Sequence, residues 1–214
     1  IKNVYYAFED PDFRTFKKAK KIFDQKGIKS KLIRSKNYNN FYKSYFINKK
    51  KSVPFVTAKI AVSKDYLTIN KKSKWITNKT SRNIVHLLRS RYDCILSTSK
   101  SVNQDDSLLN CRIDGLNNKK PDLFIIDLKL KLRKKLLLNK YLKIRKTYLI
   151  TSKKKHNQTS EYKKLGYKII LIDKLDDKND LNLLYKKIYK TGYSRVLIET
   201  GLTFLNNLIK NKMI

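Results

Sequence analysis

The sequence has few residues of the kinds that bind metals or form disulfides. Its 214 residues include only two cysteines, Cys94 and Cys111, and two histidines, His86 and His156. Neither cysteine has a second cysteine or a set of histidine ligands near it, which excludes the recognisable zinc motifs and a disulfide framework. We therefore expect no metal site, and a reducing, cytoplasmic setting is the default.

Long apolar runs and the common phosphate-binding loops are also missing. No apolar run approaches the length of a membrane span, and the N-terminus lacks the pattern of a signal peptide, so we expect no membrane partner. Neither G-x-G-x-x-G nor G-x-x-x-x-G-K-[ST] occurs, which excludes the usual dinucleotide and triphosphate loops. The chain begins with Ile1 rather than Met, which predicts that it is a fragment.

Acidic residues are scarce relative to basic ones. Asp and Glu number 17 against 51 Lys and Arg, which gives a formal net charge of +34. Such a charge favours anionic partners such as nucleic acid, nucleotides or phosphosugars. The lysines are spread along the whole chain, whereas a nucleic-acid site would gather its charge on one element. We favour solvated lysines and no nucleic-acid partner, and keep a basic nucleic-acid-binding module as the alternative.

The first part of the chain alternates strand and helix patterns. Expected elements cover residues 2–8 (strand), 15–25 (helix), 28–33 (strand) and 38–47 (helix). This unit is too small to close a hydrophobic core alone. A polar, basic stretch follows and then Pro54, so we place a boundary between domains 1–50 and 51–214.

The second part continues the alternation over a longer stretch. A helix capped by Thr77 or Asn78 should run to about residue 91 and bury Ile84, Val85, Leu87 and Leu88. Residues 128–146 are expected to form a surface segment lying on the core. Further strands are expected over residues 55–62, 66–69, 92–98, 123–126, 147–151, 167–172 and 194–199, with helices over 181–189 and after Gly201. This alternation predicts an α/β fold with a largely parallel sheet flanked by helices.

Lys59 lies inside the predicted strand over residues 55–62. The two-residue period of a strand places it on the same side as Thr57 and Ala61, a small and largely apolar face. An ammonium group on such a face is costly without a partner. We expect an acidic partner, either Asp105 or Glu199. The alternative is an edge strand with Lys59 in water.

Polar residues follow two of the predicted strands. Residues 97–101 carry hydroxyls and a lysine, and Glu199 ends the last strand just before Gly201. Open α/β sheets bind ligands at such strand ends, and a following helix offers free N–H groups to a phosphate. Asp105 and Asp106 could orient ribose hydroxyls, bind a metal or act as acid and base. Ordinary turns and helix caps remain the alternatives for all of these.

Three further side chains suit a phosphorylated ligand. Trp75, the only Trp, would offer a flat surface to a base or nicotinamide, although a core position is equally in keeping with its type. Arg89 and Arg112 are candidate phosphate-binding forks, with ordinary surface positions as the alternative.

Five segments, in order, resemble the reductase domain of the bifunctional riboflavin-biosynthesis deaminase/reductase. They are F-V-T-A-K-I-A-V-S-K-D (55–65), S-K-W-I-T (73–77), L-L-R-S-R (87–91), residues 97–112 and residues 196–205. Residues 1–47, notably E-D-P-D at 9–12, resemble the end of that protein's cytidine-deaminase-like domain. The resemblance implies a dihydrofolate-reductase-like mixed sheet, and it suggests a homodimer.

The resemblance also implies an activity and its residues. The activity is reduction, with NADPH, of the ribosyl group of 5-amino-6-(5-phosphoribosylamino)uracil to a ribityl chain, with a phosphorylated pyrimidine as substrate. The implied catalytic residues, which orient the opened sugar and supply its proton, are Lys59, Asp105 and Glu199. The implied cofactor contacts are Ala61, Trp75, Ser101, Asp105, Gly201 and Thr203. The implied substrate contacts are Ser73, Arg89, Leu108, Arg112 and Glu199.

The sequence departs from the family pattern in four ways. Tyr66 stands where the family usually has Gly, and T-G-L-T at 200–203 replaces a final G-G-P-T or A-G-P-T turn. The zinc motifs His-x-Glu and Pro-Cys-x-x-Cys are absent, so we expect zinc and deamination to belong to a part of the family protein outside this chain. The family domain continues past its last helix, which predicts a domain truncated at its C-terminus. An inactive remnant is therefore a further alternative.

Overall fold

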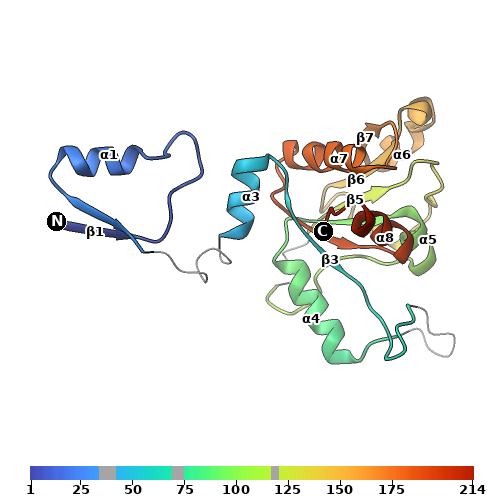
Figure 1. Ribbon diagram of the computed structural model, residues 1–214. Helices are drawn as coiled ribbons and strands as arrows, with labels where there is room; N and C mark the ends of the chain where they lie inside the picture. The colour runs from blue at the N-terminus through green and yellow to red at the C-terminus, as the bar shows by residue number, and fades with distance from the viewer. Residues whose placement is uncertain (34–41, 69–74, 117–120) are drawn as a thin grey trace. The chain divides into compact units, whose positions relative to one another are not determined.

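The computed structural model describes residues 1–33, 42–68, 75–116 and 121–214 (Figure 1). The chain divides into two compact units, Ile1–Phe55 and Val56–Ile214. The division falls close to the boundary predicted from the sequence.

The first unit contains a short two-stranded parallel sheet. Its elements are β1 (Asn3–Tyr6), α1 (Lys18–Gln25), β2 (Lys29–Leu32) and α3 (Lys43–Lys51). Residues 48–51, expected to be a polar linker, belong to α3 instead. The side-chain amide of Asn48 donates to the carbonyl of Val53 at 2.8 Å, which holds the end of this helix. The first residues of the helix predicted over 38–47 lie outside the described part of the chain.

Two aspartates join the turn before α1 to helix α3. Asp10 Oδ1 accepts a hydrogen bond from the hydroxyl of Tyr45 at 2.8 Å. Asp12 Oδ2 accepts hydrogen bonds from Arg14 at 2.7 Å and from Lys49 at 2.8 Å. Carboxylates that accept several charge-assisted bonds are strong local anchors, so these contacts fix the loop that follows β1.

The second unit is built on a six-stranded sheet (Figure 1). The strands are β3 (Phe55–Lys59), β4 (Cys94–Thr98), β5 (Asp122–Ile126), β6 (Thr147–Ser152), β7 (Lys168–Ile172) and β8 (Arg195–Glu199). The α-helices are α4 (Lys79–Ser90), α5 (Ser99–Asp105), α6 (Ser160–Leu165), α7 (Lys178–Lys190) and α8 (Leu202–Lys210), and short 3-10 helices cover η1 (Leu137–Tyr141) and η2 (Lys153–Gln158).

The strand order is β3-β8-β4-β5-β6-β7. The pairs β8–β4, β4–β5, β5–β6 and β6–β7 are all parallel, which confirms the predicted, mostly parallel α/β fold. The last strand of the chain is thus inserted between β3 and β4. This insertion brings the end of β8 beside the ends of two strands that lie far from it in the sequence.

The central strands are buried on both faces. Successive residues Cys94, Ile95 and Leu96 are all 0% exposed, as are Val196, Leu197 and Ile198. Because neighbouring residues of a strand point to opposite faces, both faces of the sheet must be covered. The segment over 128–146 contributes to this cover, since its side chains Leu132, Leu136 and Leu138 belong to the main hydrophobic cluster.

Helix α4 orients differently from its sequence prediction. Its cap is Asn78, whose side-chain oxygen accepts from the amide of Ser81 at 2.8 Å, as predicted. Ile84 is 56% exposed and Leu87 is 37% exposed, so their expected burial is wrong. Leu88 packs against the core cluster. The inward face of this helix carries the polar residues His86 and Arg89, which are described below. A prediction based on the spacing of apolar residues therefore assigned the wrong face to the core.

The prediction of a strand over residues 66–69 is wrong for residues 66–68, which are the ones that the structure describes. Strand β3 is also shorter than predicted, because it ends at Lys59 rather than at residue 62. Tyr66 has a φ of 61°, and its amide donates to the carbonyl of Ser63 at 3.0 Å. The amide of Leu67 donates to the hydroxyl of Ser63 at 3.0 Å. A tight turn held by Ser63 therefore replaces the strand. None of the helices in the described ranges is long and apolar enough to cross a membrane.

Candidate functional site

The polar site lies where β3, β8 and helix α4 meet. Lys59 is the last residue of β3, Glu199 is the last residue of β8, and Arg89 lies in the final turn of α4. Ligand sites of open α/β sheets lie at the carboxyl ends of strands, and here β3 and β8, which end in Lys59 and Glu199, are neighbours in the sheet.

Glu199 binds two cationic side chains. Its carboxylate is 8% exposed and receives two hydrogen bonds from Arg89, from Nε to Oε1 at 2.6 Å and from Nη2 to Oε2 at 2.9 Å. Lys59 Nζ lies 3.7 Å from Oε2 of the same carboxylate. The two-pronged contact with the guanidinium fixes the plane of the carboxylate. The lysine partner predicted from the sequence is therefore Glu199.

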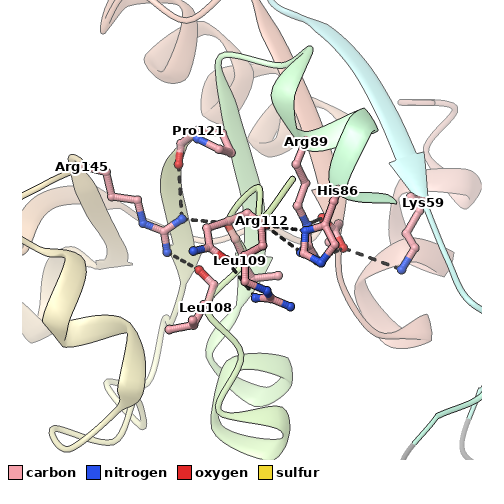
Figure 2. Close-up of polar contacts among 10 residues, drawn as sticks. Lys59, His86, Arg89, Leu108, Leu109, Arg112, Pro121 and Arg145 are labelled. Carbon is pink, nitrogen blue, oxygen red and sulfur yellow. Dashed lines mark hydrogen bonds and ion pairs between the residues drawn. The ribbon is translucent and has the colours of Figure 1, made fainter. Parts of the chain in front are cut away.

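Asn110 links Arg89 to Arg112. It is 2% exposed, and its main-chain oxygen accepts from Arg89 Nη1 at 3.1 Å. Its side-chain oxygen accepts from Arg112 Nη1 at 2.9 Å. One residue thus positions one guanidinium with its backbone and another with its side chain. Figure 2 shows these guanidinium groups converging from α4 and from the loop after α5.

His86 completes this group from one turn earlier in α4. Its Nδ1 lies 3.0 Å from the oxygen of Asn110. Burial lowers the pKa of His86, and the nearby charges of Arg89 and Arg112 lower it further. The neutral ring with a proton on Nδ1 satisfies the carbonyl acceptor.

Arg112 carries donors that the protein itself leaves largely unused. It is exposed, and its side chain makes one hydrogen bond within the described ranges, the one to Asn110. The loop around its inner atoms removes part of the water that would surround Arg112, which lowers its pKa, and the neighbouring Arg89 adds to this effect. A guanidinium in this position can bind a phosphate or carboxylate with its remaining N–H groups.

Arg145 lies behind the same loop and is 4% exposed. It donates to the carbonyls of Leu108 at 2.5 Å, Leu109 at 2.7 Å and Pro121 at 3.3 Å (Figure 2). Burial lowers the pKa of Arg145 to about 10. Leu108, an expected substrate contact, uses its main-chain oxygen for this bond.

A cluster of hydroxyl groups lies at the ends of β4 and β8. Ser101 Oγ accepts from the amide of Gly201 at 3.1 Å and lies 3.1 Å from Thr98 Oγ1. Thr200 Oγ1 donates to Thr98 Oγ1 at 3.4 Å. The beginning of α5 and the beginning of α8 are therefore joined through Ser101. Gly201 has a φ of −74°, so its place does not depend on the conformational freedom of glycine.

Three of the remaining predicted site residues belong to separate segments of the chain. Ala61 follows the end of β3 and is half-buried, and Thr203 is exposed in the first turn of α8. Trp75 is 52% exposed, and the guanidinium of Arg82 lies 4.5 Å from its ring centre. Ser73 lies outside the described residues.

The two adjacent aspartates have separate positions. Asp105, one of the two expected partners of Lys59, is the last residue of α5 and is exposed. The carboxylate that lies within ion-pair distance of Lys59 is that of Glu199. Asp106 has a φ of 44° and ends α5, and its carboxylate accepts from the amide of Leu137 at 2.9 Å. The turn-and-cap alternative thus describes Asp106. The described residues hold no group of three or more side chains able to bind a metal ion.

Sequence reasoning missed Asn110 and Arg145. The position of Asn110, two residues before Arg112, was a usable signal, because a short polar side chain can reach a neighbouring guanidinium. Arg145 carried no such signal, since its partners are backbone carbonyls.

Comparison with known proteins gives one consistent result. The family described as RibD C-terminal domain matches residues 54–214. The riboflavin biosynthesis protein RibD of Haemophilus influenzae is 32% identical over 117 residues, which cover 53% of this chain and 32% of that protein.

Two solved structures share the fold over nearly the whole chain. Acinetobacter baumannii RibD has a TM-score of 0.81 at 22% identity and covers 100% of this chain and 58% of its own. A Thermotoga maritima protein described as a diaminohydroxyphosphoribosylaminopyrimidine deaminase and 5-amino-6-(5-phosphoribosylamino)uracil reductase has a TM-score of 0.79 at 23% identity, covering 98% of this chain and 57% of its own. The chain thus spans under three fifths of the length of these two proteins.

Proposed function

Since the chain belongs to the RibD C-terminal domain family, we propose that it reduces the ribosyl group of 5-amino-6-(5-phosphoribosylamino)uracil with NADPH. The observation that carries this proposal is the arrangement of Lys59, Glu199 and Arg89 at the strand ends, with Arg112 beside them. The Thermotoga relative, which shares the fold, is described as a reductase of the same compound.

The reaction defines what the side chains must do. Conversion of a ribosylamine to a ribitylamine adds a hydride at C1 and a proton at the ring oxygen, which leaves C1. Lys59 is suited to donate this proton, because its ammonium is 29% exposed and Glu199 holds it at the strand ends. General acid catalysis by a positioned group of this kind is worth about 10²–10⁴ in rate.

The phosphate of the substrate is assigned to Arg112. Arg89 already donates three hydrogen bonds, two to Glu199 and one to Asn110. Its role is therefore to orient Glu199 and to add positive potential. Arg112 keeps most of its donors for a ligand, and a guanidinium matches the geometry of a phosphate. Leu108 and Ser73 remain proposed neighbours of the substrate.

NADPH, when bound, supplies the hydride. The hydroxyls of Thr98, Ser101 and Thr200 and the first amides of α8 fit its phosphates, because helix N-termini and hydroxyl donors both favour anions. Gly201 and Thr203 belong to this region. Ala61 and Trp75 are proposed to line the nicotinamide side, and Asp105 to accept a hydrogen bond from a ribose hydroxyl.

Residues 1–50 are proposed to be the end of a deaminase-type domain. This proposal is supported by relatives that align with the whole chain, such as the Buchnera aphidicola riboflavin biosynthesis protein RibD, of which the alignment covers 60%. A homodimer is proposed on family grounds alone.

The experiment is NADPH oxidation at 340 nm with the purified chain and the phosphorylated pyrimidine. We expect turnover by the unchanged chain and a fall in kcat of at least about 100-fold for Lys59→Ala. Lys64→Ala, which changes an exposed lysine near Lys59, serves as the matched control and should keep full activity. Asp105→Ala should raise the KM for NADPH.

Two results would count against these assignments. Full activity of Lys59→Ala would remove the proposed proton donor while leaving the reaction itself intact. Absence of any turnover by the unchanged, folded chain would overturn the proposed function. Steep loss of RNA affinity with rising salt in the same preparation would then favour the basic binding module.

A further inference from the structure

Arg145 is a buried cation without an acidic ion-pair partner in the described ranges. It stands two residues before β6 and is 4% exposed. Asp122 is the acid that acts on its pKa, but no carboxylate oxygen of the described residues lies within ion-pair distance of it. A buried guanidinium opposes folding unless hydrogen bonds compensate for the loss of water. Its position therefore requires a specific geometric reason.

Its partners supply that reason. The guanidinium donates to three backbone carbonyls, at Leu108, Leu109 and Pro121. The first two belong to the loop that leads directly to Asn110 and Arg112, and the third immediately precedes β5. Arg145 thus ties the loop over residues 108–112 to the start of a central strand. Figure 2 shows it on the side of the loop opposite Lys59.

Leu109 shows that the loop is held in an unfavourable shape. Its φ is 45°, in the left-handed region that side chains with a Cβ avoid. Its side chain is 6% exposed, within the core cluster, and its carbonyl receives the 2.7 Å bond from Arg145. The next residue, Asn110, then directs its carbonyl to Arg89 and its side chain to Arg112.

We propose that Arg145 is a positioning residue for the phosphate end of the substrate. It holds the loop over residues 108–112 so that Asn110 presents Arg112 in a fixed orientation. Arg145 does not touch the substrate, because its own donors face the protein interior. The inference rests on the proposed function for the identity of the substrate. The order in which the contacts act, from Arg145 through the loop to Arg112, rests on geometry alone.

The test compares three variants of the full chain. Arg145→Met removes the donors and keeps much of the volume, Arg145→Lys keeps a charge and donors, and Arg133→Met changes an exposed arginine as the matched control. Ribose 5-phosphate binding is measured by calorimetry, NADPH binding by fluorescence, and KM and kcat by NADPH oxidation.

We expect Arg145→Met to weaken ribose 5-phosphate binding and raise the KM for the pyrimidine by about tenfold, since small misplacements of binding groups cost that much or more. NADPH binding should change by less than about twofold, because the hydroxyl cluster is held by other contacts. Arg145→Lys should recover part of the loss, and Arg133→Met should match the unchanged chain.

A double-mutant cycle separates positioning from general damage. If Arg145 acts through Arg112, then Arg112→Gln combined with Arg145→Met will bind ribose 5-phosphate no more weakly than Arg112→Gln alone. Fully additive losses of ribose 5-phosphate affinity in the double mutant would overturn the inference. Unchanged ribose 5-phosphate binding by folded Arg145→Met would also overturn it, as would equal losses of affinity for ribose 5-phosphate and for NADPH. If Arg145→Met does not fold, Arg145→Gln takes its place in the same cycle with the same criteria.

The binding experiment does not depend on turnover. An unchanged chain that binds ribose 5-phosphate through Arg112 but does not oxidise NADPH would refute the proposed function and leave the role of Arg145 open to the same cycle. Normal turnover together with unaltered binding by Arg145→Met would refute the role of Arg145 alone.

Discussion

Replacing Glu199 by Gln tests the centre of the site through its stability. The substitution keeps the size of the side chain and one acceptor oxygen, but removes the charge that holds Arg89 and Lys59. Arg89 is 12% exposed, so it would lose one charge-assisted hydrogen bond without gaining full access to water. A hydrogen bond to a charged group contributes about 1.5–3 kcal/mol, so we expect a loss of about 2 kcal/mol in the free energy of unfolding.

Urea unfolding followed by the fluorescence of Trp75 measures this loss. Trp75 is the only tryptophan and lies in the second unit, so its signal reports on that unit. With an m-value of about 2 kcal/mol per molar urea, the midpoint should fall by about 1 M. Glu161→Gln is the matched control, because Glu161 pairs with Lys134 on the surface and is 61% exposed.

The control should shift the midpoint by less than about 0.5 M, since exposed ion pairs contribute about 0–1 kcal/mol and the m-value is about 2 kcal/mol per molar. Equal shifts for the two variants would refute the reasoning, because they would show that burial of the Glu199 pair adds nothing. A more stable Glu199→Gln would refute it more strongly, by showing that desolvation of the charges outweighs their attraction.

Two predictions concern pH. Hydrogen bonds from Arg14, and then from Lys49, hold the pKa of Asp12 well below its ordinary value of 3.8. The ionised Asp12 therefore stabilises the first unit fully above pH 3.8, and this stability is lost as the pH falls from 3.8 toward the lowered pKa. Near-ultraviolet circular dichroism between about pH 5 and 2 should show this loss in the unchanged chain, and a smaller pH dependence in Asp12→Asn. Burial lowers the pKa of His86 below 6.5, which favours the neutral ring in the folded state. The stability that depends on the neutral ring is therefore complete above pH 6.5 and is lost as the pH falls through the lowered pKa. The urea midpoint of the second unit should therefore fall between about pH 7 and 5, and a slope unchanged in His86→Gln would contradict this.

The sequence predicted the central strands well because their signal is local. Residues 94–96 and 123–126 are short apolar runs bounded by polar residues, and strands buried on both faces have that pattern whatever their neighbours are. The place of Glu199 at a strand end followed from the same local pattern. The parallel sheet then followed from the alternation of strands with helices.

The contacts of the site were less accessible, because they depend on strand order. Lys59 had two candidate acidic partners in the sequence, and only the insertion of β8 beside β3 selects Glu199. The face of α4 was misjudged because its inward side carries His86 and Arg89, while Ile84 is exposed. The partners of Arg145 are carbonyl groups, which every residue possesses, so no side-chain pattern could indicate them.

The insertion of β8 between β3 and β4 has a consequence for how the chain reaches its folded state. Among the strands that the structure describes, β3 has β8 as its sole neighbour, although almost the whole second unit separates the two in sequence. During synthesis, β3 emerges early and must wait for β8 before it gains its hydrogen-bonding partner. A ribosome-stalled chain ending before residue 195 should therefore be able to assemble β4 to β7 while β3 stays open to proteolysis and the Lys59 site is not yet formed.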